Sequence, residues 1–188
     1  MNLSYPLSDL RAVRRAPVAG TDLLQRLGAC FFDIVPLRYR TYCTLTARIV
    51  QVVLRHYGQA ASLLPCQLWC ITPANNYVVG FVDGVATQPG KWNGHVICVS
   101  GGRFIDAAVH QLKRDFDISA SVPNVVIGKC FGISSHAISR ADLDRQAHLL
   151  WLTAPQGQSV ALPPDSSRMV DQLAGALIDH LDGLPLLQ

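Results

Sequence analysis

Residues 91–106 read KWNGHVICVSGGRFID, and this stretch decides how the middle of the chain folds. Two apolar runs flank Gly101–Gly102, which is the signal for a β-hairpin with a two-residue loop. In that register Ile97 lies opposite Asp106, and His95 shares their face of the sheet. The hairpin therefore predicts a His95–Asp106 pair in which the carboxylate orients the imidazole and stabilises its charged form. The alternative is that His95 is an ordinary polar residue at a strand start and that Asp106 is an ordinary strand-end cap.

Residues 41–58, TYCTLTARIVQVVLRHYG, predict a helix that begins beside a cysteine. Its apolar residues keep helical spacing, with Thr41 as the N-cap and Gly58 just beyond the C-terminal end. Cys43 then lies in the first turn, where the backbone dipole and the free amides favour a thiolate. Cys43, His95 and Asp106 together supply a nucleophile, a base and an orienting group.

The remaining elements predict an α+β domain, because helices come first, an antiparallel sheet follows and a helix closes the chain. We expect one domain over residues 1–188, without internal repeats. The predicted elements are a short helix around 21–30 with an irregular stretch ending near Pro36, strands within 60–73, 77–84 and 124–131, a strand or helical segment at 148–154, and a closing helix at 165–183.

The composition excludes several classes of protein. Hydrophobic residues make up 49% and charged residues 15%, which is typical of a globular chain rather than a disordered one. The net charge of +3 and the scattered basic residues argue against nucleic-acid binding. No apolar run approaches the ~20 residues of a membrane span, and residues 1–15 do not form a classical secretory signal. We therefore expect a cytoplasmic protein without a membrane partner, with export by a non-classical route left open.

The six cysteines predict neither disulfides nor a metal site. Reduced thiols are the default in a chain of this size that carries no secretory signal. There is no C-x2-C pair, and Cys66 and Cys70 share one face of a predicted strand, most simply in the core. No glycine-rich phosphate loop follows a strand, so no cofactor is expected.

The order of these motifs resembles the transglutaminase-like superfamily, which shares a papain-like catalytic core with the arylamine N-acetyltransferases. The likeness covers about residues 38–112 and runs through YCTLTARIVQVVLRHYG, QAASLLPCQLW, WNGHVICV and RFIDAAVHQL. It implies a helix carrying the cysteine packed on an antiparallel sheet, with Cys43 as nucleophile, His95 as general base and acid, and Asp106 as orienter. The chain departs from the family pattern at three points. The usual glycine before the cysteine is missing in RTYC, the aromatic residue that commonly follows the histidine is replaced in GHVICV, and DAA stands where the family often has Asp-x-Thr.

The expected function is a thioester-forming enzyme that hydrolyses or deamidates an amide in a peptide, a protein or a small molecule. An acyltransferase using the same triad, or a catalytically silent binding module of the same fold, are the alternatives. The amide of Cys43 is an expected oxyanion donor. Trp92 or Trp69 could line the acyl pocket or simply belong to the core, and Gln111 could contact substrate or lie on the solvated surface. No oligomeric state is implied.

Overall fold

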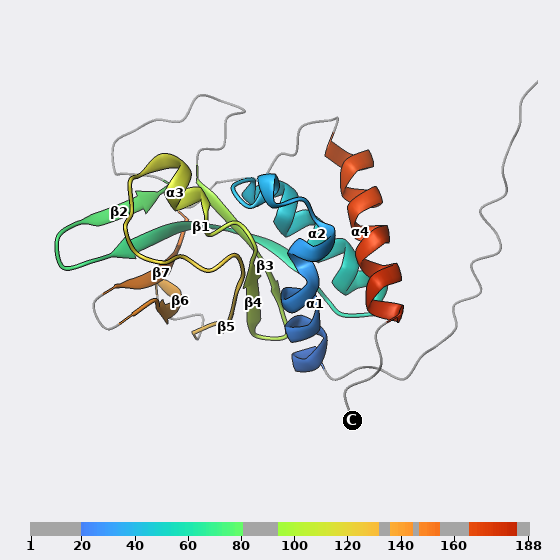
Figure 1. Cartoon of the computed structure of the whole chain (residues 1–188). Helices are drawn as coiled ribbons and strands as arrows, with labels where there is room; N and C mark the ends of the chain where they lie inside the picture. Colours follow the sequence, from blue (N-terminus) through green and yellow to red (C-terminus); the bar gives the residue numbers. More distant parts are fainter. Residues whose placement is uncertain (1–19, 81–93, 132–135, 145–146, 155–165, 184–188) are drawn as a thin grey trace, which may run out of the picture.

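The computed structural model describes residues 20–80, 94–131, 136–144, 147–154 and 166–183, and it combines helices with an antiparallel sheet (Figure 1). The predicted α+β class is confirmed. The helices are α1 (Gly20–Ile34), the 3-10 helix η1 (Leu37–Tyr39), α2 (Cys43–His56), the short α3 (Gln111–Asp115) and α4 (Ser166–Gly183). The strands are β1 (Ser62–Ile71), β2 (Asn76–Val79), β3 (His95–Ser100), β4 (Arg103–Asp106), β5 (Val126–Lys129), β6 (Ala137–Asp142) and β7 (His148–Thr153).

The long strand β1 organises the sheet, whose order is β5-β4-β3-β1-β7-β6 with β2 also paired to β1. One edge of β1 pairs with β3 and then with β2, and the other edge pairs with β7, always antiparallel. The strands at the two ends of this order, β5 and β6, lie close to one another. The Phe131 amide donates to the Ile138 carbonyl (2.7 Å), and the Ser139 hydroxyl donates to the Lys129 carbonyl (2.8 Å). The sheet is therefore nearly closed.

Strand alternation divides the core into two parts. Inside the curved sheet lie residues such as Leu68, Ile97, Phe104 and Trp151, all almost completely buried. On its outer face, α2 packs on the residues of β3 and β4 that point the other way, including Val96, Cys98 and Ile105, α1 packs on β5, and α4 covers α1 and α2. Figure 1 shows these three helices grouped on one side of the sheet, with α2 between β3 and α4. Since successive side chains alternate, a single strand serves both cores.

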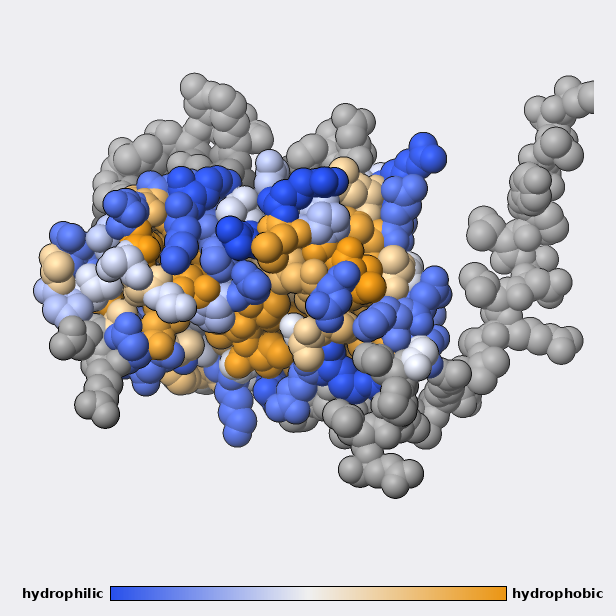
Figure 2. Space-filling view, in the orientation of Figure 1, coloured by the Kyte–Doolittle hydropathy of each residue, from blue (hydrophilic) through white to orange (hydrophobic). Residues whose placement is uncertain are grey.

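The helix layer approaches the sheet closely at α1. A Cβ atom added at Gly28 would lie 2.6 Å from Cδ1 of Ile127 in β5, so a glycine there allows α1 to pack directly on that strand. Partly buried apolar side chains, including Phe32, Val125 and Ile127, border this contact. Figure 2 shows hydrophobic residues in the middle of this face, over α1 and the neighbouring strands, surrounded by hydrophilic ones.

Two sequence predictions are confirmed in detail. The Gly101–Gly102 loop gives the expected register, in which Cys98 pairs with Ile105 and Ser100 pairs with Arg103. Gly58 follows α2 with a φ of 74°, its amide donates to the Arg55 carbonyl, and the Gln59 amide donates to the Leu54 carbonyl. This double hydrogen bond is the Schellman arrangement, which explains why a glycine ends the helix.

Other expectations were wrong at element boundaries. Helix α1 extends to Ile34 instead of stopping near residue 30, and residues 37–39 form a 3-10 turn. The N-cap of α2 is Tyr42 rather than Thr41, and no side chain caps this helix start. Strand β6 and helix α3 were not predicted, whereas the ambiguous segment at 148–154 is the strand β7. Among the described helices, none has the length and hydropathy needed to cross a membrane.

Candidate active site

The carboxylate of Asp106 is the fixed point of the site. It ends β4, and its Oδ2 atom accepts hydrogen bonds from Nε2 of His95 (2.7 Å) and Nε1 of Trp151 (2.8 Å). Its Oδ1 atom accepts the backbone amide of Ala108 (2.9 Å), two residues further along the chain. Asp106 is 1% exposed, so all three bonds lie away from water. A carboxylate held by three buried donors has little freedom to rotate.

Trp151 reaches Asp106 only because the sheet curves. The two residues lie on strands three steps apart in the order β4-β3-β1-β7, which would separate them by roughly 14 Å across a flat sheet. Both face the inside of the nearly closed sheet, where the ring of Phe104 also lies 4.8 Å from the Trp151 ring, centroid to centroid. The curvature therefore brings an indole N–H from β7 onto a carboxylate of β4.

His95, the first residue of β3, is fully buried and uses both ring nitrogens. Nε2 faces Asp106, and Nδ1 lies 3.0 Å from Oε1 of Gln111. Burial alone would lower the pKa of His95, but the charge of Asp106, the hydrogen bond to it and the interaction with Cys43 outweigh this effect. The pKa consequently lies well above its usual value, which favours an imidazolium that donates from both nitrogens.

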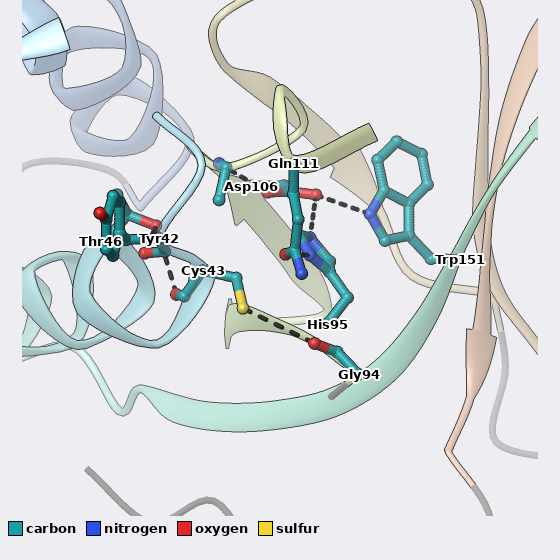
Figure 3. A network of polar contacts seen from close by, with 9 residues as sticks. Tyr42, Cys43, Thr46, Gly94, His95, Asp106, Gln111 and Trp151 are labelled. Carbon is teal, nitrogen blue, oxygen red and sulfur yellow. Dashed lines mark hydrogen bonds and ion pairs between the residues drawn. The ribbon is translucent and has the colours of Figure 1, made fainter. Parts of the chain in front are cut away.

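Cys43 is the first residue of α2 and points toward the start of β3 (Figure 3). Its thiol donates a hydrogen bond to the carbonyl oxygen of Gly94 (3.8 Å), the residue before His95, and it also interacts with the imidazole. Cys43 is 7% exposed. The amide of Thr46 bonds the Tyr42 carbonyl, whereas the three amides before it belong to the helix start, where no intrahelical acceptor exists. The helix start therefore offers free N–H groups beside the thiol.

The structure thus brings Cys43, His95 and Asp106 together, as the sequence predicted from the hairpin register and the helix start. The other candidate residues have different outcomes. Gln111 contacts His95 and is 5% exposed, so the alternative of a solvated surface position was wrong. Trp69 is half-buried and donates its indole N–H to Gln67 (3.1 Å) rather than to any group of the triad. Trp92 lies outside the described residues.

Sequence reasoning missed two groups, the indole of Trp151 and the backbone amide of Ala108. Trp151 was visible only as an aromatic in an ambiguous apolar segment, and its role depends on how far the sheet closes. The Ala108 amide follows from a local turn, since an aspartate side chain commonly accepts the amide two residues ahead. That second signal was available in the sequence.

Burial is the main influence on the thiols of the other five cysteines. Burial raises the pKa of the thiols of Cys30, Cys66, Cys70, Cys98 and Cys130, and that of Cys98 reaches about 12. Cys66 and Cys70 face the interior of the sheet on either side of Leu68, as predicted. Within the described ranges, no group of three or more histidine, cysteine, aspartate or glutamate residues could hold a metal ion.

Comparisons with protein-family models, with curated proteins and with solved structures found no match to this chain. The geometry of Cys43, His95 and Asp106 is therefore the basis on which a function can be argued. The buried histidine–aspartate pair and the thiol at a helix start are two separate observations that meet at one imidazole.

Proposed function

We propose that this chain is a thiol-dependent acyl-enzyme catalyst with a papain-like, transglutaminase-like core, and that it hydrolyses or deamidates an amide in a peptide or protein. Cys43 is the nucleophile, His95 the general base and acid, and Asp106 the orienter. One observation carries the proposal: a fully buried imidazole is bonded to a carboxylate at 2.7 Å and also interacts with a thiol at a helix start. These are the three roles that thiol acyl transfer requires.

The reaction would proceed in two balanced halves. The Cys43 sulfur attacks the amide carbonyl carbon, His95 gives its proton to the leaving nitrogen, and the C–N bond breaks to leave a thioester. Water then transfers a proton to His95 while its oxygen attacks the thioester, and the C–S bond breaks to release a carboxylic acid and the thiolate. The oxyanion of each tetrahedral intermediate would lie near the free amides at the start of α2, including that of Cys43.

Asp106 supports this cycle without exchanging a proton. Bonds from Trp151 and Ala108 fix the carboxylate of Asp106, and this carboxylate holds Nε2 of His95. Nδ1 is therefore the ring nitrogen available for proton transfer. The attraction between the carboxylate and the imidazolium raises the pKa of His95 and stabilises the charged form that accompanies a thiolate. An acyltransferase would use the same groups and differ only in the acceptor that attacks the thioester.

The first test is the pH dependence of iodoacetamide alkylation, with mass spectrometry to locate the label. We compare the native chain with His95→Ala and with His56→Ala, which removes an exposed histidine at the far end of the same helix. An ion-paired thiolate would make Cys43 react about 10- to 100-fold faster near pH 6 than an ordinary thiol. The other five thiols, with raised pKa values, should remain almost unlabelled.

We expect His95→Ala to abolish the reaction of Cys43 at low pH and His56→Ala to leave it unchanged. The shape of the pH profile, rather than the absolute rate, is the readout, because partial burial of Cys43 slows all variants alike. A profile that does not depend on His95 would refute the proposed catalyst and favour a catalytically silent binding module of the same fold. A confirmed pair would justify a screen of peptide amides for hydrolysis and ammonia release.

A further inference from the structure

Nδ1 of His95 is the ring nitrogen that Asp106 does not hold, and the side-chain oxygen of Gln111 lies 3.0 Å from it. The thiol of Cys43 donates to the carbonyl of Gly94 (3.8 Å), the residue before His95, and it also interacts with this imidazole. We infer that Gln111 is a positioning residue that competes with Cys43 for Nδ1 and so sets how much of the resting protein carries a reactive thiolate. This inference rests on the proposed function, because it assigns a control to the same Cys–His pair.

The imidazole has an orienting partner besides Gln111. Asp106 already fixes Nε2 at 2.7 Å, and Trp151 and Ala108 fix Asp106 in turn. A second contact at Nδ1 therefore adds little to the direction of the ring. Its main effect is to give the Nδ1 proton an acceptor other than the sulfur of Cys43.

The position of Gln111 ties this contact to the rest of the site. Gln111 is the first residue of α3, it is 5% exposed, and its backbone amide is bonded to the Ala108 carbonyl (2.8 Å). From the last turn of α3, Nη1 of Arg114 donates to the Thr41 carbonyl (3.4 Å), two residues before Cys43. Helix α3 thus spans from the hairpin that carries the histidine to the start of the helix that carries the cysteine. Figure 3 shows the Gln111 side chain reaching the imidazole.

The hydrogen bonds of the resting site fit a competition. The Cys43 thiol donates to the Gly94 carbonyl (3.8 Å), and Nδ1 of His95 lies 3.0 Å from the Gln111 oxygen, so each of the two groups has a hydrogen-bond partner other than the opposite member of the Cys–His pair. A carboxamide oxygen is a neutral acceptor, so a thiolate, which is charged, makes the stronger partner for an imidazolium N–H. Gln111 consequently restrains the ion pair in the resting protein without preventing it, and a substrate that displaces its carboxamide would release the restraint.

Two substitutions at one position separate competition from orientation. Gln111→Met keeps the length of the side chain but removes the acceptor, which leaves the Nδ1 proton to Cys43. Gln111→Glu places a charged acceptor at the same point and also repels a thiolate. Gln51→Met is the matched control, since Gln51 is 4% exposed and loses its side-chain bonds to Arg48 and Ala61 in the same substitution, away from His95.

The experiment is the pH profile of Cys43 alkylation by iodoacetamide in these variants and in His95→Ala, with urea unfolding to confirm that each is folded. We expect Gln111→Met to raise the rate near pH 6 about fivefold, which is the value of one ordinary hydrogen bond. Gln111→Glu should lower the rate by at least as much and move the acid limb of the profile to higher pH. Gln51→Met should change stability but not the profile.

Slower labelling of Gln111→Met, or a profile that neither Gln111 variant moves, would overturn the inference while His95→Ala still abolishes the reaction at low pH. In that event the proposed catalyst stands and Gln111 is only a packing or orienting group. If His95→Ala itself leaves the profile unchanged, the proposed function fails and the competition fails with it. The His95 variant thus distinguishes the two failures.

Discussion

Asp106→Asn is the substitution that tests the site most directly, because it removes the charge of the side chain and keeps its size. The asparagine oxygen can replace only one of the two carboxylate oxygens, and its NH2 group must replace the other. That NH2 group then faces either the amide of Ala108 or the donors of His95 and Trp151. At least one buried donor loses its acceptor, which costs about 1–3 kcal/mol. The loss of the charge that faces His95 brings the expected destabilisation to about 3–5 kcal/mol.

The pH dependence of this loss has a definite sign. The pKa of His95 in the folded chain lies above its usual value, so the contribution of the ion pair is complete below about pH 6.5 and is lost as the pH rises through the folded-state pKa. Without the Asp106 charge, the largest effect that raises the pKa of the imidazole is gone, and the effect of burial, which lowers this pKa, remains. The difference between the native chain and Asp106→Asn is therefore largest near pH 6 and narrows toward alkaline pH.

The assay is urea unfolding near pH 6, 7.5 and 9, with Asp142→Asn as the matched control. Asp142 makes the same kind of contact with Arg140 (3.0 Å), but both side chains are more than half exposed. Such an exposed ion pair contributes less than about 1 kcal/mol. Equal losses at the two positions, or a loss at Asp106 that does not vary with pH, would refute the account of Asp106 as a buried charged anchor.

Two further substitutions test the packing around the site. Trp151→Phe keeps an aromatic ring but removes the donor to Asp106. We expect it to lower the free energy of unfolding, measured by urea titration, by about 1.5–3 kcal/mol. A loss smaller than the lower end of that range would contradict the contribution of this hydrogen bond. Gly128→Ala would place a Cβ atom 2.4 Å from the buried ring of Phe104 and should cost about 1–3 kcal/mol. The same change at Gly175, which has open space on α4, should raise the free energy of unfolding by up to about 1 kcal/mol. Effects of the same sign at both glycines would contradict this packing.

The sequence predicted the part of the site that local rules control. A two-residue glycine loop sets the parity of its hairpin, and that parity alone places His95 and Asp106 on one face. The spacing of apolar residues and the terminal Gly58 located α2, which puts Cys43 in its first turn. These inferences need only the residues within one element or one turn.

The parts that were missed depend on the whole sheet or on weak local signals. Trp151 contacts Asp106 because strands three steps apart in the sheet curve toward each other, and no local sequence pattern predicts that curvature. Thr41 was a good N-cap by residue type, yet the helix begins two residues later at Cys43 without a side-chain cap. Helix α3, which places Gln111 on the imidazole, has five residues and is too short for helical periodicity to be seen.

The candidate site joins residues that lie far apart along the chain, and this separation has a consequence for folding. The contact between Trp151 and Asp106 joins residues 45 apart, and that between Cys43 and Gly94 joins residues 51 apart. Contacts of such high order form late, because the chain must first lose the entropy of closing large loops. A partly folded chain with α2 and the β3–β4 hairpin in place would hold His95 against Asp106, but Asp106 would still lack its bond to Trp151. We therefore expect the bond between Trp151 and Asp106 to form only in the final phase of refolding, when β7 joins β1, so the proposed nucleophile gains its full support only when the native structure is complete.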